Sequence, residues 1–194
     1  MLKVPREEFD RITNEKNIKI SIDVMFFYED ESEKLKSLSD GSVLKSGESY
    51  TIYIKPSDIC YMYIYQVDSL GKSFRLFPNS EFNTAANPLS PGNEYWMPNP
   101  KQLFVLDETT GKENFYIFAS LDKIDEFEGD KSVNLAKTDL DNIVAIKRMG
   151  VSRVKDKRDT VSVVSPKKEI DVVEIKKKLQ AEGSFIYETW FWHK

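Results

Sequence analysis

The stretch Ile59-Cys60-Tyr61-Met62-Tyr63-Ile64-Tyr65-Gln66-Val67 is the strongest β-strand signal in the chain. Side chains of a strand alternate between its two faces, and here both faces are largely apolar. Such a strand is covered on both sides, as a central strand is. The turn Asp68-Ser69-Leu70-Gly71-Lys72 follows, with glycine where a hairpin needs positive φ, and residues 73–77 return antiparallel. The sequence therefore predicts a hairpin at the centre of the fold.

Strand signals continue on both sides of this hairpin. Ile18 to Val24 alternates apolar and polar residues, and Tyr50 to Ile54 is a strand that Pro56 ends. Residues 79–100 are expected to form a loop with a brief extended piece around 95–97, and further strands are expected at residues 103–106 and 113–120. Short strands with turns every ~8–12 residues are typical of a sandwich or barrel. We therefore expect a mainly β protein, an immunoglobulin-like antiparallel β-sandwich with two or three flanking helices.

Helices are expected mainly outside this block. Pro5 and early acidic residues favour a helix over 5–16, and apolar spacing favours helices over 138–149 and 170–181, ended by Gly150 and Gly183. Residues 29–40 are predicted as a loop or short helix, and residues 121–129 as an acidic helix start. The predicted organisation is one domain over 1–194: a β-sandwich block at 17–120, a helical or loop insertion at 121–183, and a closing strand at 184–194. Trp190 and Trp192 share one face of that strand, which needs a cover or a partner if its edge is unpaired.

Composition excludes several classes of protein. One Cys and one His in 194 residues exclude an intramolecular disulfide framework, a Cys/His zinc finger and a His-rich metal site. A net charge of −4 argues against nucleic acid as a partner, because phosphate neutralisation needs an excess of Lys and Arg. No apolar run reaches the ~18 residues of a transmembrane helix, and residues 1–14 lack the apolar core of a signal peptide. We expect an exported, periplasmic or lipoprotein-tethered domain if a signal sequence was removed before Met1, and a cytoplasmic protein otherwise.

Catalytic sets are hard to assemble from this sequence. Cys60 lies within an apolar strand and His193 is the penultimate residue, so a buried inert thiol and an exposed imidazole are expected. No Gly-x-Ser-x-Gly elbow is present, and neither is a phosphate-binding glycine loop. A carboxylate pair among the 32 acidic residues stays open as an alternative. We predict no catalytic residue, no cofactor and no enzyme activity.

Two charged segments have simple interpretations. The acidic run over 122–130 lacks the spacing of a calcium-binding loop and is expected to be solvated, so no metal site is predicted. The basic segment 147–158 is expected to be a solvated loop, with contact to an anionic surface as the alternative.

Aromatic residues gather around the central hairpin and the Pro-rich loop after it. Aromatic side chains fill β-sandwich cores, and they also form recognition surfaces. Core packing is the simpler interpretation for the group, but Trp96, in a loop between prolines, is the best single contact residue. The candidate binding residues are Tyr61, Tyr63, Tyr65, Phe77, Tyr95 and Trp96.

Residues 44–120 resemble a known family. The matching stretches are Leu44-Lys45-Ser46-Gly47-Glu48-Ser49-Tyr50, Tyr61 to Lys72, Leu76-Phe77-Pro78-Asn79, Asn87-Pro88-Leu89, and Leu106 to Glu113. This order resembles the bacterial family labelled domain of unknown function 4384, and the closing strand resembles its tail. The resemblance implies an accessory β-domain, often in exported proteins or lipoproteins and sometimes fused to kinase-like or caspase-like domains. It implies no activity.

We therefore predict a non-catalytic binding or interaction module of a bacterial cell-envelope or signalling assembly, with a protein as partner. The alternatives are a carboxylate-dependent hydrolase and a structural accessory domain of a larger protein.

Overall fold

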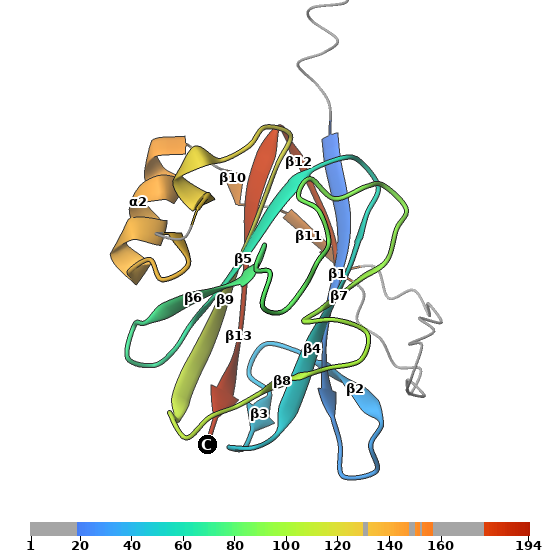
Figure 1. The fold of residues 1–194 in the computed structure, drawn as a ribbon, viewed down its shortest axis with the longest axis vertical. Coiled ribbons are helices and arrows are strands. Elements are labelled where there is room, and N and C mark those ends of the chain that lie inside the picture. The colour runs from blue at the N-terminus through green and yellow to red at the C-terminus, as the bar shows by residue number, and fades with distance from the viewer. Residues whose placement is uncertain (1–18, 130–131, 148–149, 152, 157–176) are drawn as a thin grey trace, which may run out of the picture.

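The computed structural model describes residues 19–129, 132–147, 150–151, 153–156 and 177–194, which form two β-sheets (Figure 1). The first sheet has the order β11(Arg153–Asp156), β12(Lys177–Glu182), β1(Lys19–Glu29), β4(Ser49–Pro56), β7(Tyr95–Met97), with β2(Leu35–Leu38) beside β1 and β8(Phe104–Val105) beside β4. The second has the order β10(Gly150–Val151), β13(Ser184–His193), β9(Gly111–Ser120), β5(Tyr61–Val67), β6(Ser73–Phe77), with β3(Val43–Leu44) beside β13. The prediction of a mainly β fold is confirmed.

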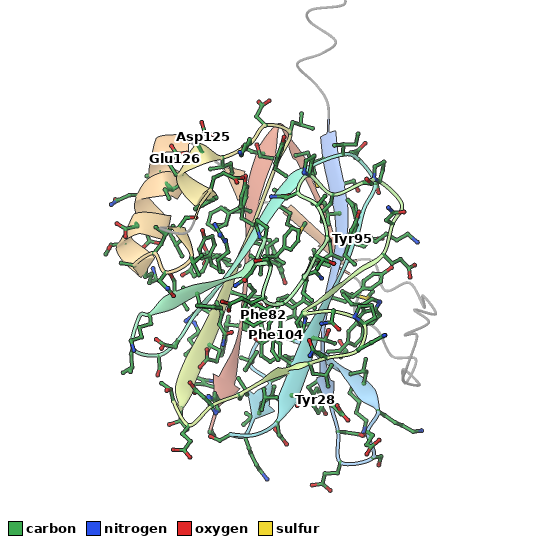
Figure 2. All side chains as sticks on the ribbon, viewed as in Figure 1. Tyr28, Phe82, Tyr95, Phe104, Asp125 and Glu126 are labelled. Atoms are coloured by element: carbon green, nitrogen blue, oxygen red, sulfur yellow. The ribbon has the colours of Figure 1, made fainter. Side chains whose placement is uncertain are left out.

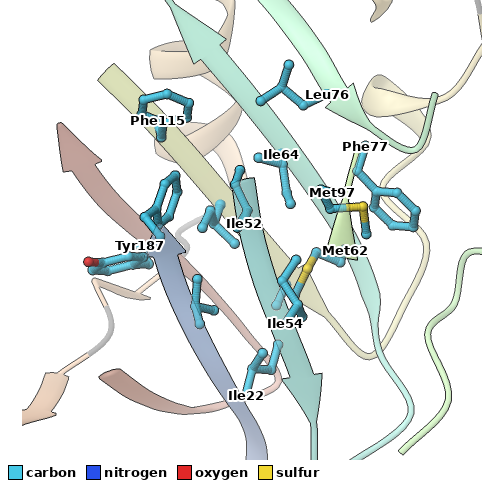
Figure 3. Packing of buried hydrophobic residues seen from close by; sticks show 14 of the residues in the cluster. Ile22, Ile52, Ile54, Met62, Ile64, Leu76, Phe77, Met97, Phe115 and Tyr187 are labelled. Atoms are coloured by element: carbon cyan, nitrogen blue, oxygen red, sulfur yellow. The ribbon is translucent and has the colours of Figure 1, made fainter. Parts of the chain in front are cut away.

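The main hydrophobic core lies between the two sheets (Figure 3). Ile22, Ile52 and Ile54 of the first sheet contribute to it, and Met62 and Ile64 of the second; all are fully buried. β5 lies between β6 and β9, as its two apolar faces predict, and the turn after it has Gly71 at φ 79°. The inward-facing side chains of the expected strands thus form the core, as the alternation of side chains along a strand requires.

A second cluster covers the outer face of the second sheet. Tyr63 and Tyr65 of β5 pack there with Phe127 of the 3₁₀ turn η2(Asp125–Phe127) and with Leu140 and Ile143 of α2(Lys137–Lys147). The acidic segment 121–129 therefore forms a 3₁₀ turn, and the helix expected over 138–149 is present as α2. Within the described ranges, α2 is the one α-helix; the helix expected over 5–16 lies outside them.

Two predictions of secondary structure were wrong. Residues 177–181, expected to end a helix, form β12, which pairs antiparallel with β1. Residues 35–38, expected in a loop or short helix, form β2, which pairs with the other end of β1. In both places pairing with β1 prevails over the local sequence preference, because strand formation depends on the neighbouring strand. Consequently the predicted helical insertion at 121–183 also supplies strands to both sheets.

The closing strand predicted at 184–194 is present as β13, which ends at His193. β13 pairs antiparallel with β9 over its whole length and parallel with β3 and β10 on its other side. Its edges are thus occupied where β3 and β10 lie. Trp190 and Trp192 lie on its outer face, and the Lys112 ammonium stands 4.3 Å from the Trp190 ring centroid.

No helix among the described residues is long and apolar enough to cross a membrane.

Candidate functional site

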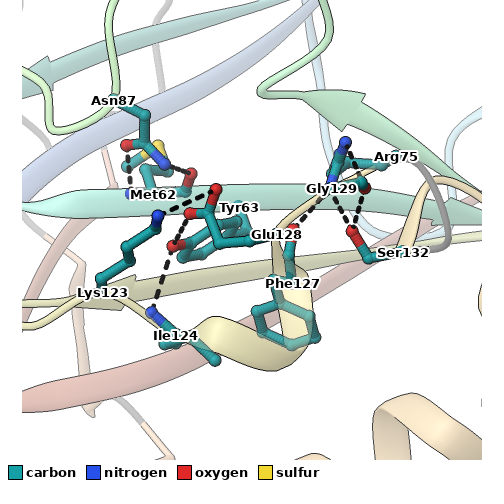
Figure 4. Close-up of polar contacts among 10 residues, drawn as sticks. All are labelled: Met62, Tyr63, Arg75, Asn87, Lys123, Ile124, Phe127, Glu128, Gly129 and Ser132. Carbon is teal, nitrogen blue, oxygen red and sulfur yellow. Dashed lines mark hydrogen bonds and ion pairs between the residues drawn. The ribbon is translucent and has the colours of Figure 1, made fainter.

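The six candidate binding residues lie in different parts of the fold. Tyr63 and Tyr65 are fully buried under the outer layer, with Tyr61 at its half-buried margin. The Tyr63 hydroxyl donates to Glu128 Oε1 at 2.7 Å and accepts from the Ile124 amide at 3.1 Å (Figure 4). The Tyr65 hydroxyl donates to the Ser132 carbonyl at 2.8 Å. Through these contacts Tyr63 and Tyr65 attach Ile124, Glu128 and Ser132 to the sheet, and the two rings offer no free surface.

The other three candidates do not join them. Phe77 is fully buried in the main core. Trp96 is 5% exposed and packs on the outer face of the first sheet, 5.1 Å from Tyr53 and 5.9 Å from Phe27 between ring centroids. Tyr95 is half-buried, and its hydroxyl accepts a hydrogen bond from the Ser90 amide. A single recognition surface built on these six residues is therefore not present; core packing, the simpler interpretation, describes most of the group.

A groove of about 320 Å³ opens where the β8 edge of the first sheet faces β5 and β6 of the second, and we call it the edge groove. Its size falls within the range of small ligand sites. Its lining is Tyr50, Gln66, Asp68, Lys72, Ser73, Phe74, Leu76, Phe82, Phe104, Val105, Leu106, Asp107, Glu113 and Asn134.

Aromatic rings form one side of the edge groove. Phe82 and Phe104 lie edge to face with centroids 5.3 Å apart, and both are labelled near the middle of Figure 2. Phe74 lies 5.8 Å from Phe82, and Tyr50 lies 5.2 Å from Phe104. Phe74, Phe82 and Phe104 are each only partly buried, so their rings provide apolar contact area to a ligand.

A chain of polar side chains lies at the base of the edge groove. Tyr50 donates its hydroxyl to Gln66 Oε1 at 2.6 Å, and Gln66 Nε2 donates to Glu113 Oε2 at 2.8 Å. Glu113 Oε1 lies 3.6 Å from His193 Nδ1, and His193 Nε2 lies 2.9 Å from Ser46 Oγ. Glu113 and His193 are only 2% and 1% exposed. The prediction of an exposed His193 was therefore wrong.

Burial is the main cause of the pKa shifts in this row of polar side chains. Desolvation raises the pKa of the Glu113 carboxyl; Gln66 and His193 lower it in part, and the charge of Asp68 raises it further. Desolvation also raises the pKa of the Tyr50 phenol, and the nearby Glu113 adds to that rise. A buried carboxyl with a raised pKa in a groove is a mark of functional sites as well as of structural networks.

Ser46, His193 and Glu113 have the order of a serine–histidine–acid relay. However, the Ser46 amide donates to the Lys194 carbonyl and the Gly47 amide donates to the Leu106 carbonyl. Acyl transfer needs amides directed at the developing oxyanion, and these two are already bonded. The Nδ1–Oε1 distance of 3.6 Å is also longer than a hydrogen bond that would orient the imidazole.

The sequence does carry a signal for this polar chain. The inward-facing positions of β5 and β9 are apolar until one end, where Gln66 and Glu113 stand, and on β13 the buried His193 follows the core residue Phe191 at the matching end. A polar residue at a core position in three strands predicts a buried network once those strands are known to be neighbours. Their adjacency joins segments up to 127 positions apart, so the network is visible only in the fold.

Metal and thiol chemistry find little support in the described residues. Within those ranges no three His, Cys, Asp or Glu side chains could hold one metal ion, and Asp125 and Glu126 of the acidic segment are exposed (Figure 2). Cys60 is fully buried as expected, and burial together with the charge of Asp58 raises the pKa of its thiol to about 12. The side chains of the basic segment 147–158 lie outside the described residues.

A second hollow of about 520 Å³ adjoins the edge groove and shares Phe74 and Asn134 with it. Most of its lining comes from the loop 78–85, whose lining side chains are chiefly polar. The edge groove combines aromatic walls with a buried carboxyl, and we take it as the candidate site.

Comparison with known proteins supports the family resemblance and adds no activity. Residues 43–123 match the family described as Domain of unknown function (DUF4384), which confirms the resemblance seen in the sequence. No curated protein and no solved structure matches the chain. The matched segment contains β3 to β9 and most of the edge groove, while His193 and β13 lie beyond it.

Proposed function

We propose that this protein is a non-catalytic interaction module of a bacterial cell-envelope or signalling assembly, and that the edge groove is where it binds a protein partner. The proposal rests on one observation: partly buried aromatic rings and a few polar groups converge in a groove of about 320 Å³. This combination is characteristic of binding sites. An exported or lipoprotein-tethered location is part of the same proposal and rests on the family resemblance alone.

The relay of Ser46, His193 and Glu113 is better explained as structural than as catalytic. Its nearest amides are bonded to carbonyls, and two of its three members are almost wholly buried. Hydrogen bonds to Ser46 and Gln66 compensate part of the cost of burying His193 and Glu113.

A second candidate function is hydrolysis by a carboxylate pair. Glu113, with its raised pKa, and Asp68 line the same groove, as an acid and a nucleophile or base would. Asp68 Oδ1 is occupied by the amides of Leu70 and Lys72 in the hairpin turn, which favours a structural role for it. A role as a purely structural accessory domain is the third candidate.

We also propose that the two facing sheets are an immunoglobulin-like sandwich with flanking helices. The core shared by both sheets and the layer formed by η2 and α2 support this finer assignment.

Site-specific photo-crosslinking tests the binding proposal. A benzophenone amino acid at Val105, which is 65% exposed and lines the edge groove, should give a discrete adduct with a partner in extracts of the native cell. The matched control is the same residue at Ile59, which is 60% exposed near the opposite end of β5. Phe82→Ala should reduce the Val105 adduct by removing a groove wall. The same adducts from both positions, or none from Val105, would contradict the proposal.

A further inference from the structure

Carboxylates outnumber cations in the edge groove. Asp68, Asp107 and Glu113 line it, against the single cation Lys72. Their positions differ: Asp107 is exposed, Asp68 is half-buried, and Glu113 lies at the base. Asp68 and Glu113 act on one another, since the charge of Asp68 disfavours ionisation of Glu113. A cation that entered the groove would relieve this repulsion between like charges.

The walls suit an organic cation. The rings of Phe82 and Phe104 contact one another at right angles and Phe74 adjoins them, so a flat or compact cation can lie against an aromatic face. Such cation–π contacts contribute most where water is partly excluded, as in a groove of partly buried rings.

A metal ion fits the groove less well. Within the described part of the chain no three acidic, His or Cys side chains could share one ion. The three groove carboxylates come from the β5–β6 turn, the β8–β9 loop and β9. A volume of about 320 Å³ is also far larger than an ion with its ligands needs, and suits a side chain with its stem.

Exposed apolar residues in and beside the groove point to a protein as the bearer of this cation. Val105 lines the groove and is 65% exposed. Leu70, whose amide donates to Asp68 Oδ1, is 73% exposed in the turn that contributes Asp68 and Lys72 to the groove. A free amine would leave both of them in water, while a peptide segment with apolar neighbours would cover them.

From charge, ring geometry and these exposed apolar residues together we propose that the edge groove binds an arginine or lysine side chain, flanked by apolar residues, of a protein partner. This inference rests on the proposed function, because it names what the binding groove recognises. The cationic head lies among Asp68, Asp107 and Glu113, the stem lies along Phe82 and Phe104, and the flanking residues contact Val105 and Leu70.

Peptide titration followed by amide NMR tests the inference. The probe is acetyl-Gly-Leu-Arg-Leu-Gly-amide, and the comparison is the same peptide with citrulline, which has nearly the shape of arginine but no charge. The arginine peptide should shift the resonances of Gln66, Phe82 and Val105 and bind at least about tenfold more tightly than the citrulline peptide, as expected when a charge-assisted contact is lost. Equal binding of both peptides would overturn the inference.

Variants of the groove acids sharpen this test. Glu113→Gln keeps an acceptor for Gln66 and should weaken the arginine peptide about tenfold. Asp107→Asn changes an exposed residue, avoids the core, and should weaken it by roughly threefold. The matched control Glu31→Gln, an exposed carboxyl in the β1–β2 turn, should leave binding unchanged. Wild-type affinity in both groove variants would overturn the inference, as would displacement of the peptide by equimolar calcium ions.

The two proposals fail in different ways. If the Val105 cross-linker captures a partner that the arginine peptide does not displace, the cationic ligand is wrong and the binding groove stands. If Val105 gives no adduct and the arginine peptide does not bind, both proposals are wrong.

Discussion

Glu113 of β9 and His193 of β13 lie together inside the fold, with Oε1 of the carboxyl 3.6 Å from Nδ1 of the imidazole. Each is almost wholly removed from water. Such groups are costly to bury unless neighbouring groups compensate them. Gln66 and Ser46 provide hydrogen bonds at the two ends of the pair, so the contact joins the edge groove to the closing strand.

The ionisation of Glu113 should reduce stability as the pH rises. Its pKa in the folded protein lies above the ordinary value of 4.5, chiefly through burial, so the folded protein keeps this proton to a higher pH than the unfolded chain does. Above pH 4.5 the free energy of unfolding of the wild-type protein should therefore fall relative to that of Glu113→Gln. The total fall should be about 1.4 kcal/mol for each unit by which folding raises the pKa of Glu113, and it should level off above the folded-state pKa. Urea denaturation of both proteins from pH 4 to pH 8 measures this difference. A difference that stays constant over that range would show that Glu113 titrates alike in both states.

The groups that face Glu113 set the size of this effect. They are His193 from β13, Gln66 from β5, Asp68 from the hairpin turn and Tyr50 from β4. Asp68→Asn removes the like charge, so it should reduce the decline with pH and leave its direction unchanged.

Trp96 should matter for stability. Its ring contacts Tyr53 and Phe27 and is 5% exposed, so Trp96→Ala should lower the free energy of unfolding by about 3–5 kcal/mol through lost packing and a cavity. Trp192→Ala is the matched control, because Trp192 is 41% exposed, and it should cost less than about 1 kcal/mol. Denaturation followed by circular dichroism compares them without relying on tryptophan fluorescence. Equal losses would contradict the packing described for Trp96.

The Cys60 thiol should be inert in the folded protein. Its pKa is raised to about 12 and its side chain is fully buried, so at pH 8 it is neither ionised nor reachable. Ellman's reagent should label no thiol in the native protein and one per chain in 6 M guanidinium chloride. Labelling of the native protein at the rate of a free thiol would show that the loop 79–94 opens readily. Leu89 of this loop forms an isolated β-bridge with Cys60.

Gly111 should be far less replaceable than Gly71. Gly111 has φ 138°, and a Cβ there would lie 2.2 Å from Ser69 Cβ, whereas Gly71 at φ 79° has open space around it. Gly71→Ala should cost about 1–2 kcal/mol from backbone strain alone, and Gly111→Ala about 1–3 kcal/mol more from the clash. Chemical denaturation measures both. The double variant Gly111→Ala with Ser69→Gly should recover part of the loss; no recovery would place the cost elsewhere.

Local patterns predicted the strands well where a strand's own residues determine it. The alternation of Ile18 to Val24 predicts a strand, and the two apolar faces of β5 predict its burial within a few residues. Ser21 and Asp23, the polar positions of β1, are buried as well, which the alternation does not predict. The local pattern of β12 does not predict a strand, because its apolar spacing resembles that of a helix. Pairing with β1, more than 150 positions earlier, makes it a strand.

The candidate site was harder to predict than the fold. Burial of Tyr63, Phe77 and Trp96 depends on layers contributed by distant segments, so exposed and buried aromatic residues look alike in the sequence. The edge groove is made by Phe82, Phe104 and Glu113 from three different segments, and none of them forms a motif. His193 was mistaken for an exposed residue because terminal position is a poor guide to burial when the last strand lies inside a sheet.

The position of β13 also determines where the chain can be divided. The family match ends at residue 123, yet β9 pairs with β13 along its whole length, and β4 pairs with β1, which precedes the match. A recombinant fragment of 43–123 would expose two long unpaired edges and strip Phe191 from the rings of Tyr50 and Phe115. Open apolar edges template aggregation. Residues 19–194 are therefore the shortest span that retains every pairing described, and family boundaries alone are an unsafe guide to expression of this module.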